Sequence, residues 1–102
     1  MRILTRVLLT VVLWLPGTVA AETVPSRGVA LAHACVTCHG PDGRSQGAIP
    51  SLTTLSSADI ITALQAFRAE TRQGTVMHRI ARGLDDADIT AVATYFATLP
   101  TR

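Results

Sequence analysis

The sequence contains no lysine, so all nine basic residues of its 102 are arginines, against seven acidic residues. Arg2 and Arg6 lie at the N-terminus, and beyond them arginines and acids are equal in number. Nucleic-acid binding requires a clustered basic face, which a balanced chain without lysine does not offer. The same balance disfavours docking through a broad ring of lysines. The sequence also shows no strand pattern, internal repeat or low-complexity tract after residue 21.

Long hydrophobic runs are also missing. The apolar stretch from Val7 to Leu15 is too short to span a bilayer, which takes about 20 residues. It follows a basic start and precedes Pro16-Gly17 and the small residues 19–21, as in a secretory signal peptide. We therefore expect residues 1–21 to be cleaved, after Ala21 or Ala20, leaving one domain at 22–102. Export places the domain in the periplasm of a bacterial cell, without a membrane anchor.

Aromatic residues are scarce, and Trp14 lies within the expected signal peptide. Phe67, Tyr95 and Phe96 remain, and so small a domain rarely builds more than a few kcal/mol of stability from its own core. We expect the domain to need a further apolar component, and to be largely unfolded without it.

Cysteine is limited to two residues, both in Cys35-Val36-Thr37-Cys38-His39. Two thiols about one helical turn apart can add to the two vinyl groups of a haem, and the adjacent imidazole can then bind its iron. A thioredoxin-like redox pair or half of a zinc site would lack the preceding strand or the second ligand pair. We therefore predict one covalently bound haem c at Cys35 and Cys38, with His39 as an axial ligand.

The remaining pattern predicts an all-α domain: three main helices and a short helical turn packed around one haem. The first helix is expected at 27–38, with Ser26 as its N-cap, and its small residues should let the last helix approach closely. The second helix is expected to begin after Ser56 or Ser57 and to end near 72–74. A short helical turn is expected within 75–83, and a last helix from the N-cap Asp85 to Pro100.

Met77 is the only methionine after residue 21, and we predict it as the second axial ligand. A thioether ligand raises the haem potential and occupies the sixth site, as in an electron carrier. Two alternatives are open: Met77 is a core residue that fills a gap, or His78 binds iron in its place. His33, on the first helix, is expected to be a bystander.

Pro50 lies in the loop at 40–56, which is rich in turn residues. A ligating histidine needs an acceptor for its other ring nitrogen, often a backbone carbonyl. The carbonyl of Pro50 is either that acceptor for His39, or Pro50 is only a turn proline. The hydrophobic periodicity of the sequence does not distinguish these two roles.

Together these motifs resemble class I cytochromes c: Cys35-x-x-Cys38-His39, Pro50-x-Leu52, Met77, and an aromatic pair before Pro100. Four further motifs resemble the cytochrome subunit of flavocytochrome c sulfide dehydrogenase, which is itself similar to half of a bacterial dihaem cytochrome. They are Ala48-Ile49-Pro50-Ser51-Leu52, Phe67-Arg68 with Arg72, Met77-x-Arg79-Ile80-Ala81-x-Gly83 and Tyr95-Phe96-Ala97. The resemblance implies thioethers at Cys35 and Cys38, axial His39 and Met77, and a Pro50 carbonyl that orients His39. This chain departs by having one haem motif where some relatives have two, and by placing His78 beside Met77.

The resemblance also implies a function: a periplasmic electron-transfer protein without a catalytic site of its own. It would form a heterodimer with an FAD-containing sulfide dehydrogenase subunit, accept electrons from that subunit and pass them to a downstream periplasmic acceptor. Two alternatives are a free monohaem carrier that serves an oxidase and a haem-based ligand-binding or sensor protein.

Overall fold

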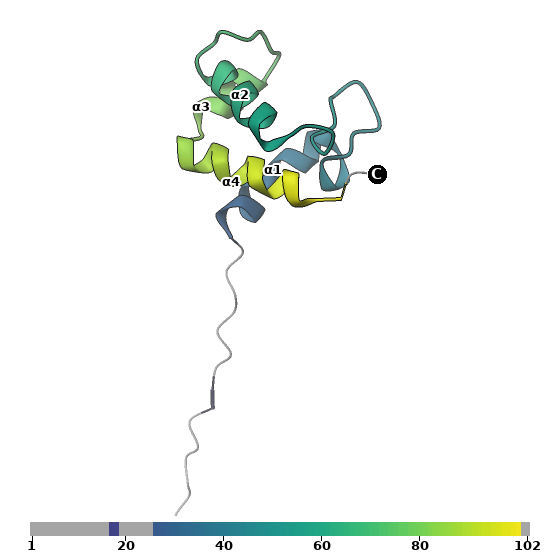
Figure 1. The fold of residues 1–102 in the computed structure, drawn as a ribbon, viewed down its shortest axis with the longest axis vertical. Helices are drawn as coiled ribbons and strands as arrows, with labels where there is room; N and C mark the ends of the chain where they lie inside the picture. The colour runs from purple at the N-terminus through teal and green to yellow at the C-terminus, as the bar shows by residue number, and fades with distance from the viewer. Residues whose placement is uncertain (1–16, 19–25, 101–102) are drawn as a thin grey trace, which may run out of the picture.

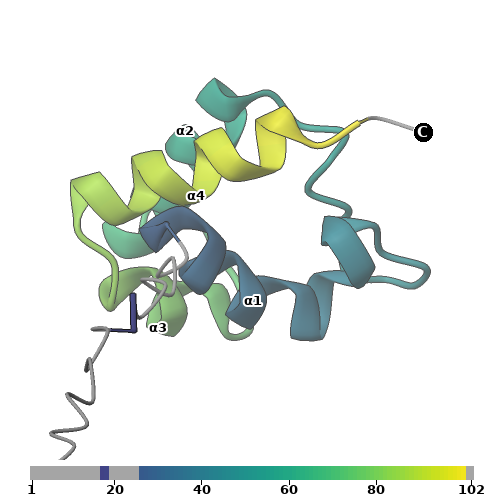
Figure 2. The ribbon, with the colours of Figure 1, turned by 90° about the horizontal axis from the view of Figure 1, so that it is seen from below.

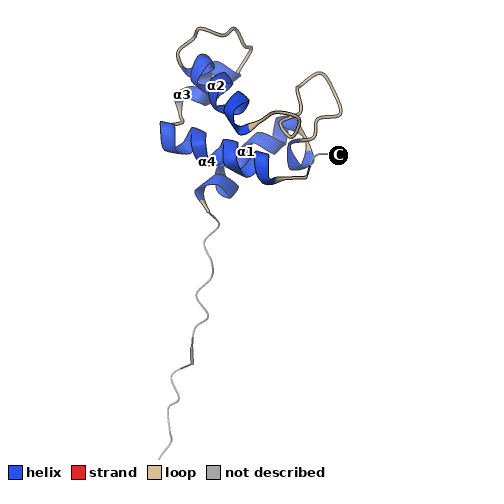
Figure 3. Ribbon diagram, in the orientation of Figure 1, coloured by secondary structure: helices blue, strands red, loops and turns tan. Residues whose placement is uncertain are grey.

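The computed structural model describes residues 17–18 and 26–100, and all regular structure in that part of the chain is helical (Figure 3). The all-α prediction is therefore confirmed. The elements are α1 (Arg27–His39), the 3₁₀ turn η1 (Pro41–Gly43), α2 (Ser57–Arg68), α3 (Met77–Arg82) and α4 (Asp86–Thr98). Apart from residues 17–18, the predicted signal peptide lies outside the described residues. No described helix is long and apolar enough to cross a membrane.

Helix α4 lies at the centre of the packing, because it contacts both α1 and α2, while α3 packs against α2 (Figures 1 and 2). The core is small and is built mainly of short aliphatic side chains, with Phe96 and Ile89 as its largest fully buried members. Tyr95 meets Phe96 edge to face, with ring centroids 5.1 Å apart. A core of this size fits the prediction that the domain draws stability from a further apolar component.

The close approach of the first and last helices was predicted, and it depends on one glycine. A Cβ atom at Gly28 of α1 would lie only 2.6 Å from the carbonyl oxygen of Ala91 in α4. Gly28 is buried, as is Ala32 one turn further along α1. The spacing of α1 and α4 is therefore set by the absence of a side chain at position 28.

Side chains cap the helices where the sequence indicated. Ser26 accepts a hydrogen bond from the backbone N–H of Val29. Ser56 is the N-cap of α2 and forms a reciprocal capping box with Asp59, whose pKa is lowered by the hydrogen bonds that Ser56 donates. Asp85 caps α4 as predicted.

Helix α2 ends at Arg68, several residues before the predicted stop near 72–74. Glu70 adopts a left-handed conformation with φ 59°, and the N–H of Thr71 then bonds back to the carbonyl of Ala66 at 3.0 Å. This is the usual closing pattern of a helix, but its left-handed residue is a glutamate. The predicted end was wrong because glycine is the usual residue in this left-handed position, and the first glycine after α2 is Gly74, four residues beyond Glu70.

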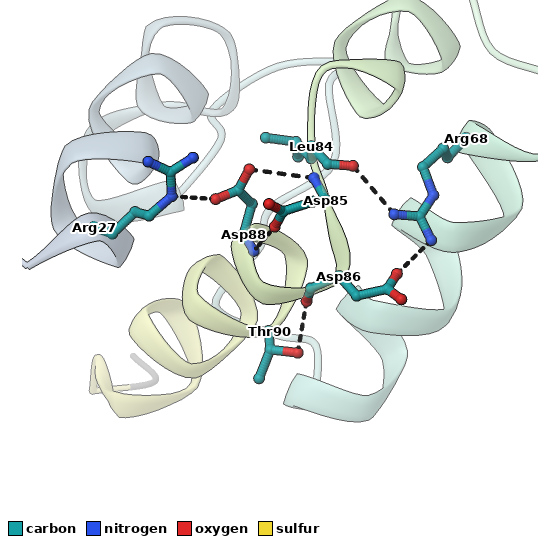
Figure 4. Close-up of polar contacts among 7 residues, drawn as sticks. All are labelled: Arg27, Arg68, Leu84, Asp85, Asp86, Asp88 and Thr90. Atoms are coloured by element: carbon teal, nitrogen blue, oxygen red, sulfur yellow. Dashed lines mark hydrogen bonds and ion pairs between the residues drawn. The ribbon is translucent and has the colours of Figure 1, made fainter.

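Two arginines hold the start of α4 against its neighbours (Figure 4). Arg27 of α1 donates to the carboxylate of Asp88, whose side chain is only 4% exposed. Arg68 of α2 donates to the carbonyl of Leu84 at 3.1 Å and to the carboxylate of Asp86 at 2.5 Å. The hydrogen bond from Arg27 is the main cause of a lowered pKa at Asp88. One end of α4 is thus tied to both helices on which it packs.

Candidate functional site

Cys35 and Cys38 lie on the last turn of α1, about one helical turn apart. Cys35 is half-buried against the core, and its thiol donates to the carbonyl of Leu31 at a sulfur–oxygen distance of 3.6 Å. Burial raises the pKa of this thiol, which keeps it protonated. Cys38 is exposed, and neither cysteine is in a disulfide. Both sulfurs therefore remain available to form thioethers.

His39 is the last residue of α1, and it is buried with 7% of its surface exposed. Its Nδ1 atom lies 2.6 Å from the carbonyl oxygen of Pro50. A carbonyl oxygen only accepts hydrogen bonds, so Nδ1 carries the proton and donates it. In a neutral imidazole this leaves a lone pair on Nε2, which is the form that binds a metal.

The loop after α1 returns Pro50 to the histidine. Gly40 ends α1 with φ 87°, a conformation that favours glycine, and the chain then turns through η1. The N–H of Leu52 bonds to the carbonyl of Gly43 at 2.7 Å, and the N–H of Ser45 bonds to the hydroxyl of Ser51 at 2.9 Å. Both bonds join residues 43–45 to the two residues that follow Pro50, and so they close the loop that carries it.

Met77 is the first residue of α3 and packs, half-buried, against the same core cluster as Cys35. His78 also is half-buried, but it borders an open polar pocket of about 330 Å³ together with Glu70, Arg72 and Gln73. His33 is exposed, as a bystander would be. The structure therefore places the side chain of Met77 against the apolar core and the imidazole of His78 beside a polar surface.

The arginines near the site have distinct partners, which the sequence did not reveal. Arg72 lies over the ring of Phe67, with its guanidinium carbon 4.8 Å from the ring centroid, and Arg82 pairs with Glu70. Arg44 donates to the carbonyl of Pro100 at 2.8 Å, which ties the loop to the end of α4. The Nε atom of Arg44 is buried, and it is the one buried side-chain polar atom in the described residues that lacks a partner.

The donor set fits a covalently held haem. It consists of two free thiols one turn apart, a buried imidazole whose tautomer is set by a backbone carbonyl, and a thioether against the core. Thioether attachment uses the thiols, and iron of this kind takes an imidazole and a thioether as axial ligands. Among the described residues no three His, Cys, Asp or Glu side chains gather into another metal site.

Fold and site together define a c-type cytochrome, and the comparison with protein families agrees: the cytochrome c model matches residues 25–100. The chain belongs to the cytochrome c family. It therefore carries haem c covalently, and it transfers electrons without a catalytic site of its own.

Among relatives, the chain is similar to the cytochrome subunit of sulfide dehydrogenase from Chlorobaculum tepidum, with 43% identity over 74 residues, 72% of this chain and 67% of that protein. It is 37% identical to cytochrome c-554(548) from Halomonas halodenitrificans over 63% of this chain and 82% of that protein. It is 41% identical to the thiosulfate dehydrogenase electron acceptor from Stutzerimonas stutzeri, over 64% of this chain but only 32% of that protein. The chain thus spans about a third of the length of this last relative. The predicted resemblance to the sulfide dehydrogenase cytochrome is confirmed.

Proposed function

We propose that this chain is a periplasmic monohaem electron carrier that accepts electrons from an FAD-containing sulfide dehydrogenase subunit. Its haem is attached at Cys35 and Cys38, and its iron is bound by His39 and Met77. Bound haem supplies one-electron chemistry, the exchange of iron between its ferric and ferrous states. The polypeptide holds the cofactor, orients the ligands and excludes water.

The observation that carries the proposal is the hydrogen bond between His39 and Pro50. A histidine that binds a metal almost always donates its other ring N–H to such an acceptor, which fixes the tautomer that leaves Nε2 free for the iron. The bond also joins the loop to the cysteine-bearing turn, so the imidazole keeps one orientation in both oxidation states. A ligand held in this way needs little rearrangement when an electron arrives or leaves.

Met77 is the better candidate for the sixth ligand because of its surroundings. Its side chain packs with the apolar core, where a neutral sulfur ligand costs little to bury. His78 borders the polar pocket on the same helix. Ligation by Met77 gives a closed sixth site and a higher potential than ligation by two histidines, as suits an electron carrier.

Carbon monoxide tests this ligation. The ferrous holoprotein should bind carbon monoxide poorly at neutral pH, and Met77→Ala should bind it readily, while the matched variant His78→Ala behaves like the wild type. Ready binding by the wild type would refute Met77 and would favour a ligand-binding or sensor function. A large change in His78→Ala alone would assign the ligand to His78 instead.

The sulfide dehydrogenase partner is supported by the similarity to the Chlorobaculum subunit and by the balanced charge of residues 22–102, which suits a lasting apolar interface better than a salt-steered encounter. A free carrier is the second candidate, because the chain covers most of cytochrome c-554(548). Purification from native periplasm distinguishes them. An FAD protein that remains bound at high salt and passes electrons from sulfide to this haem supports the first. A monodisperse monomer supports the second.

The predicted signal peptide belongs to the same proposal. N-terminal sequencing of the exported protein should find a chain that begins at residue 22, or at 21 if cleavage follows Ala20. A mature protein that retains residues 1–20 would refute cleavage at this site.

A further inference from the structure

Residues 69–76, the α2–α3 segment, join α2 to α3 and lead directly into Met77. The first half of the segment is bound to the end of α2, because the N–H groups of Thr71 and Arg72 both bond to the carbonyl of Ala66, at 3.0 and 3.3 Å. Every residue of the segment is exposed, so contacts with α2 rather than burial hold it in place. The way in which α3 begins therefore depends on those contacts.

Phe67 is the side chain of α2 against which the segment packs. Its ring is half-buried and lies against the core cluster. The guanidinium carbon of Arg72 lies 4.8 Å from the ring centroid. Gly74 comes so close to the ring that a Cβ atom there would lie 2.7 Å from Cε1. Arg72 and Gly74 thus hold the segment to one aromatic ring, the first by a cation–π contact and the second by close packing.

The same segment borders His78, the half-buried residue that follows Met77. His78 lines a polar pocket of about 330 Å³. The other residues that line this pocket all belong to the segment: Glu70, Arg72, Gln73 and Gly74. Arg82, the last residue of α3, pairs with Glu70 and so ties the helix to the segment a second time. The contacts that hold the segment therefore also build the polar surroundings of His78.

Met77 and His78 are consecutive residues of α3, so the orientation of this helix decides which of them faces the core. Successive helical residues are rotated by about 100°, and Met77 packs against the core while His78 borders the pocket. A rotation of α3 by about that angle would exchange them. His78 is a capable substitute ligand, because imidazole binds haem iron, and the chain has no lysine that could compete with it.

We propose that Arg72 and Gly74, packed on Phe67, form a clasp that presents Met77 rather than His78 to the haem iron. The polar pocket holds the imidazole of His78 while the clasp is closed. When the clasp opens, the sulfur of Met77 leaves the iron and an imidazole nitrogen of His78 binds in its place, without electron transfer. Arg72 and Gly74 are thus positioning residues. The inference rests on the proposed ligation by Met77.

Gly74→Ala tests the clasp, because its backbone is not left-handed and the new Cβ atom meets only the ring of Phe67. Ligand exchange is followed in the ferric holoprotein by the near-infrared charge-transfer band between sulfur and iron, which disappears when Met77 leaves. At a temperature below unfolding, the equilibrium constant for loss of this band should be about tenfold larger than in the wild type.

Arg72→Gln removes the cation from the ring without crowding it, and it should raise the same constant about threefold. Arg79→Gln is the matched control, because Arg79 is an exposed arginine of α3 that, within the described residues, takes part neither in the stack on Phe67 nor in the pair with Glu70. It should behave like the wild type. Equal effects of Arg72→Gln and Arg79→Gln would reflect only the lost charge and would overturn the clasp. If Gly74→Ala does not yield holoprotein, this pair of variants decides the question.

A double variant identifies the incoming ligand. Once the band is lost, electron paramagnetic resonance of Gly74→Ala should show low-spin ferric iron with two imidazole ligands. The same signal should be absent from the double variant Gly74→Ala/His78→Ala. Its persistence there would show that another group replaces Met77, and it would overturn the role given to His78.

The charge-transfer band also separates this inference from the ligation on which it rests. If the wild type lacks the band, Met77 does not bind the iron, and the ligation and the clasp both fail. If the wild type has the band and neither Gly74→Ala nor Arg72→Gln weakens it, the ligation stands and the clasp alone is overturned. Loss of the band only together with helix content, measured by far-UV circular dichroism, would show general unfolding and would also overturn the clasp.

Discussion

Replacing Gly28 with alanine tests how closely α1 and α4 must pack. The new Cβ atom would lie 2.6 Å from the carbonyl oxygen of Ala91, well inside the 3.4 Å at which ordinary contact begins. Backbone atoms cannot rotate away, so the helices must separate by several tenths of an ångström. Overpacking of this kind costs about 1–3 kcal/mol.

The opposing effect is smaller. Alanine favours the helical state over glycine by about 1 kcal/mol at most, and by less within the first turn. Steric cost therefore outweighs helix propensity, and we expect Gly28→Ala to lose about 1–2 kcal/mol of unfolding free energy. In a domain of this size each kcal/mol shifts Tm by about 4–8 °C.

Thermal unfolding of the holoprotein, followed by far-UV circular dichroism, measures the shift. Gly47→Ala is the matched control, because no atom lies within 4 Å of its Cβ position and φ is not in the left-handed region. It should be neutral or slightly stabilising, by about 0.4–1 kcal/mol through the unfolded chain. A Gly28→Ala protein as stable as Gly47→Ala would refute the argument that this glycine sets the helix spacing.

Three further predictions concern stability. The hydrogen bond from Arg27 lowers the pKa of Asp88, so ionised Asp88 stabilises the folded protein. This stabilisation should be complete above the pKa of an unfolded aspartate, about 3.9, and should be lost as the pH falls below that value. The difference in urea midpoint between the wild type and Asp88→Asn should therefore become smaller as the pH falls through this range. Phe96→Ala should cost about 3–5 kcal/mol in urea unfolding, since the ring is 1% exposed, and a loss below about 1 kcal/mol would contradict its place in the core. Glu70→Gly should raise the free energy of unfolding by about 1 kcal/mol, because glycine adopts the left-handed conformation without strain and the exposed ion pair with Arg82 contributes less than that strain costs. A Tm below that of the wild type would show that the ion pair contributes more.

Local signals in the sequence anticipated much of the fold. Capping side chains at Ser26, Ser56 and Asp85 act through hydrogen bonds to residues three positions away, so their role is visible in the sequence itself. The left-handed Glu70 is the exception. Glu70 pairs with Arg82 of α3, which packs against α2, and no short motif marks its conformation.

The ion pairs between helices could not be predicted from the sequence either, because they join residues that are far apart along the chain. Asp86 and Asp88 lie in the first turn of α4, where any acid is favourable, but Arg68 and Arg27 bind them across separations of 18 and 61 residues, respectively. Charge counting cannot choose among nine arginines, because the choice depends on which helix ends meet in space.

The sequence by itself determined the chemistry of this protein: two cysteines and a histidine at the spacing of haem attachment, and a single methionine after residue 21. These are properties of the covalent chain, and family membership agrees with them. Only the tertiary structure decided that the Pro50 carbonyl meets Nδ1 of His39, and that Met77 lies against the core while His78 borders a polar pocket. Such choices arise when distant segments pack, since burial and hydrogen-bond partners do not exist until the chain has folded.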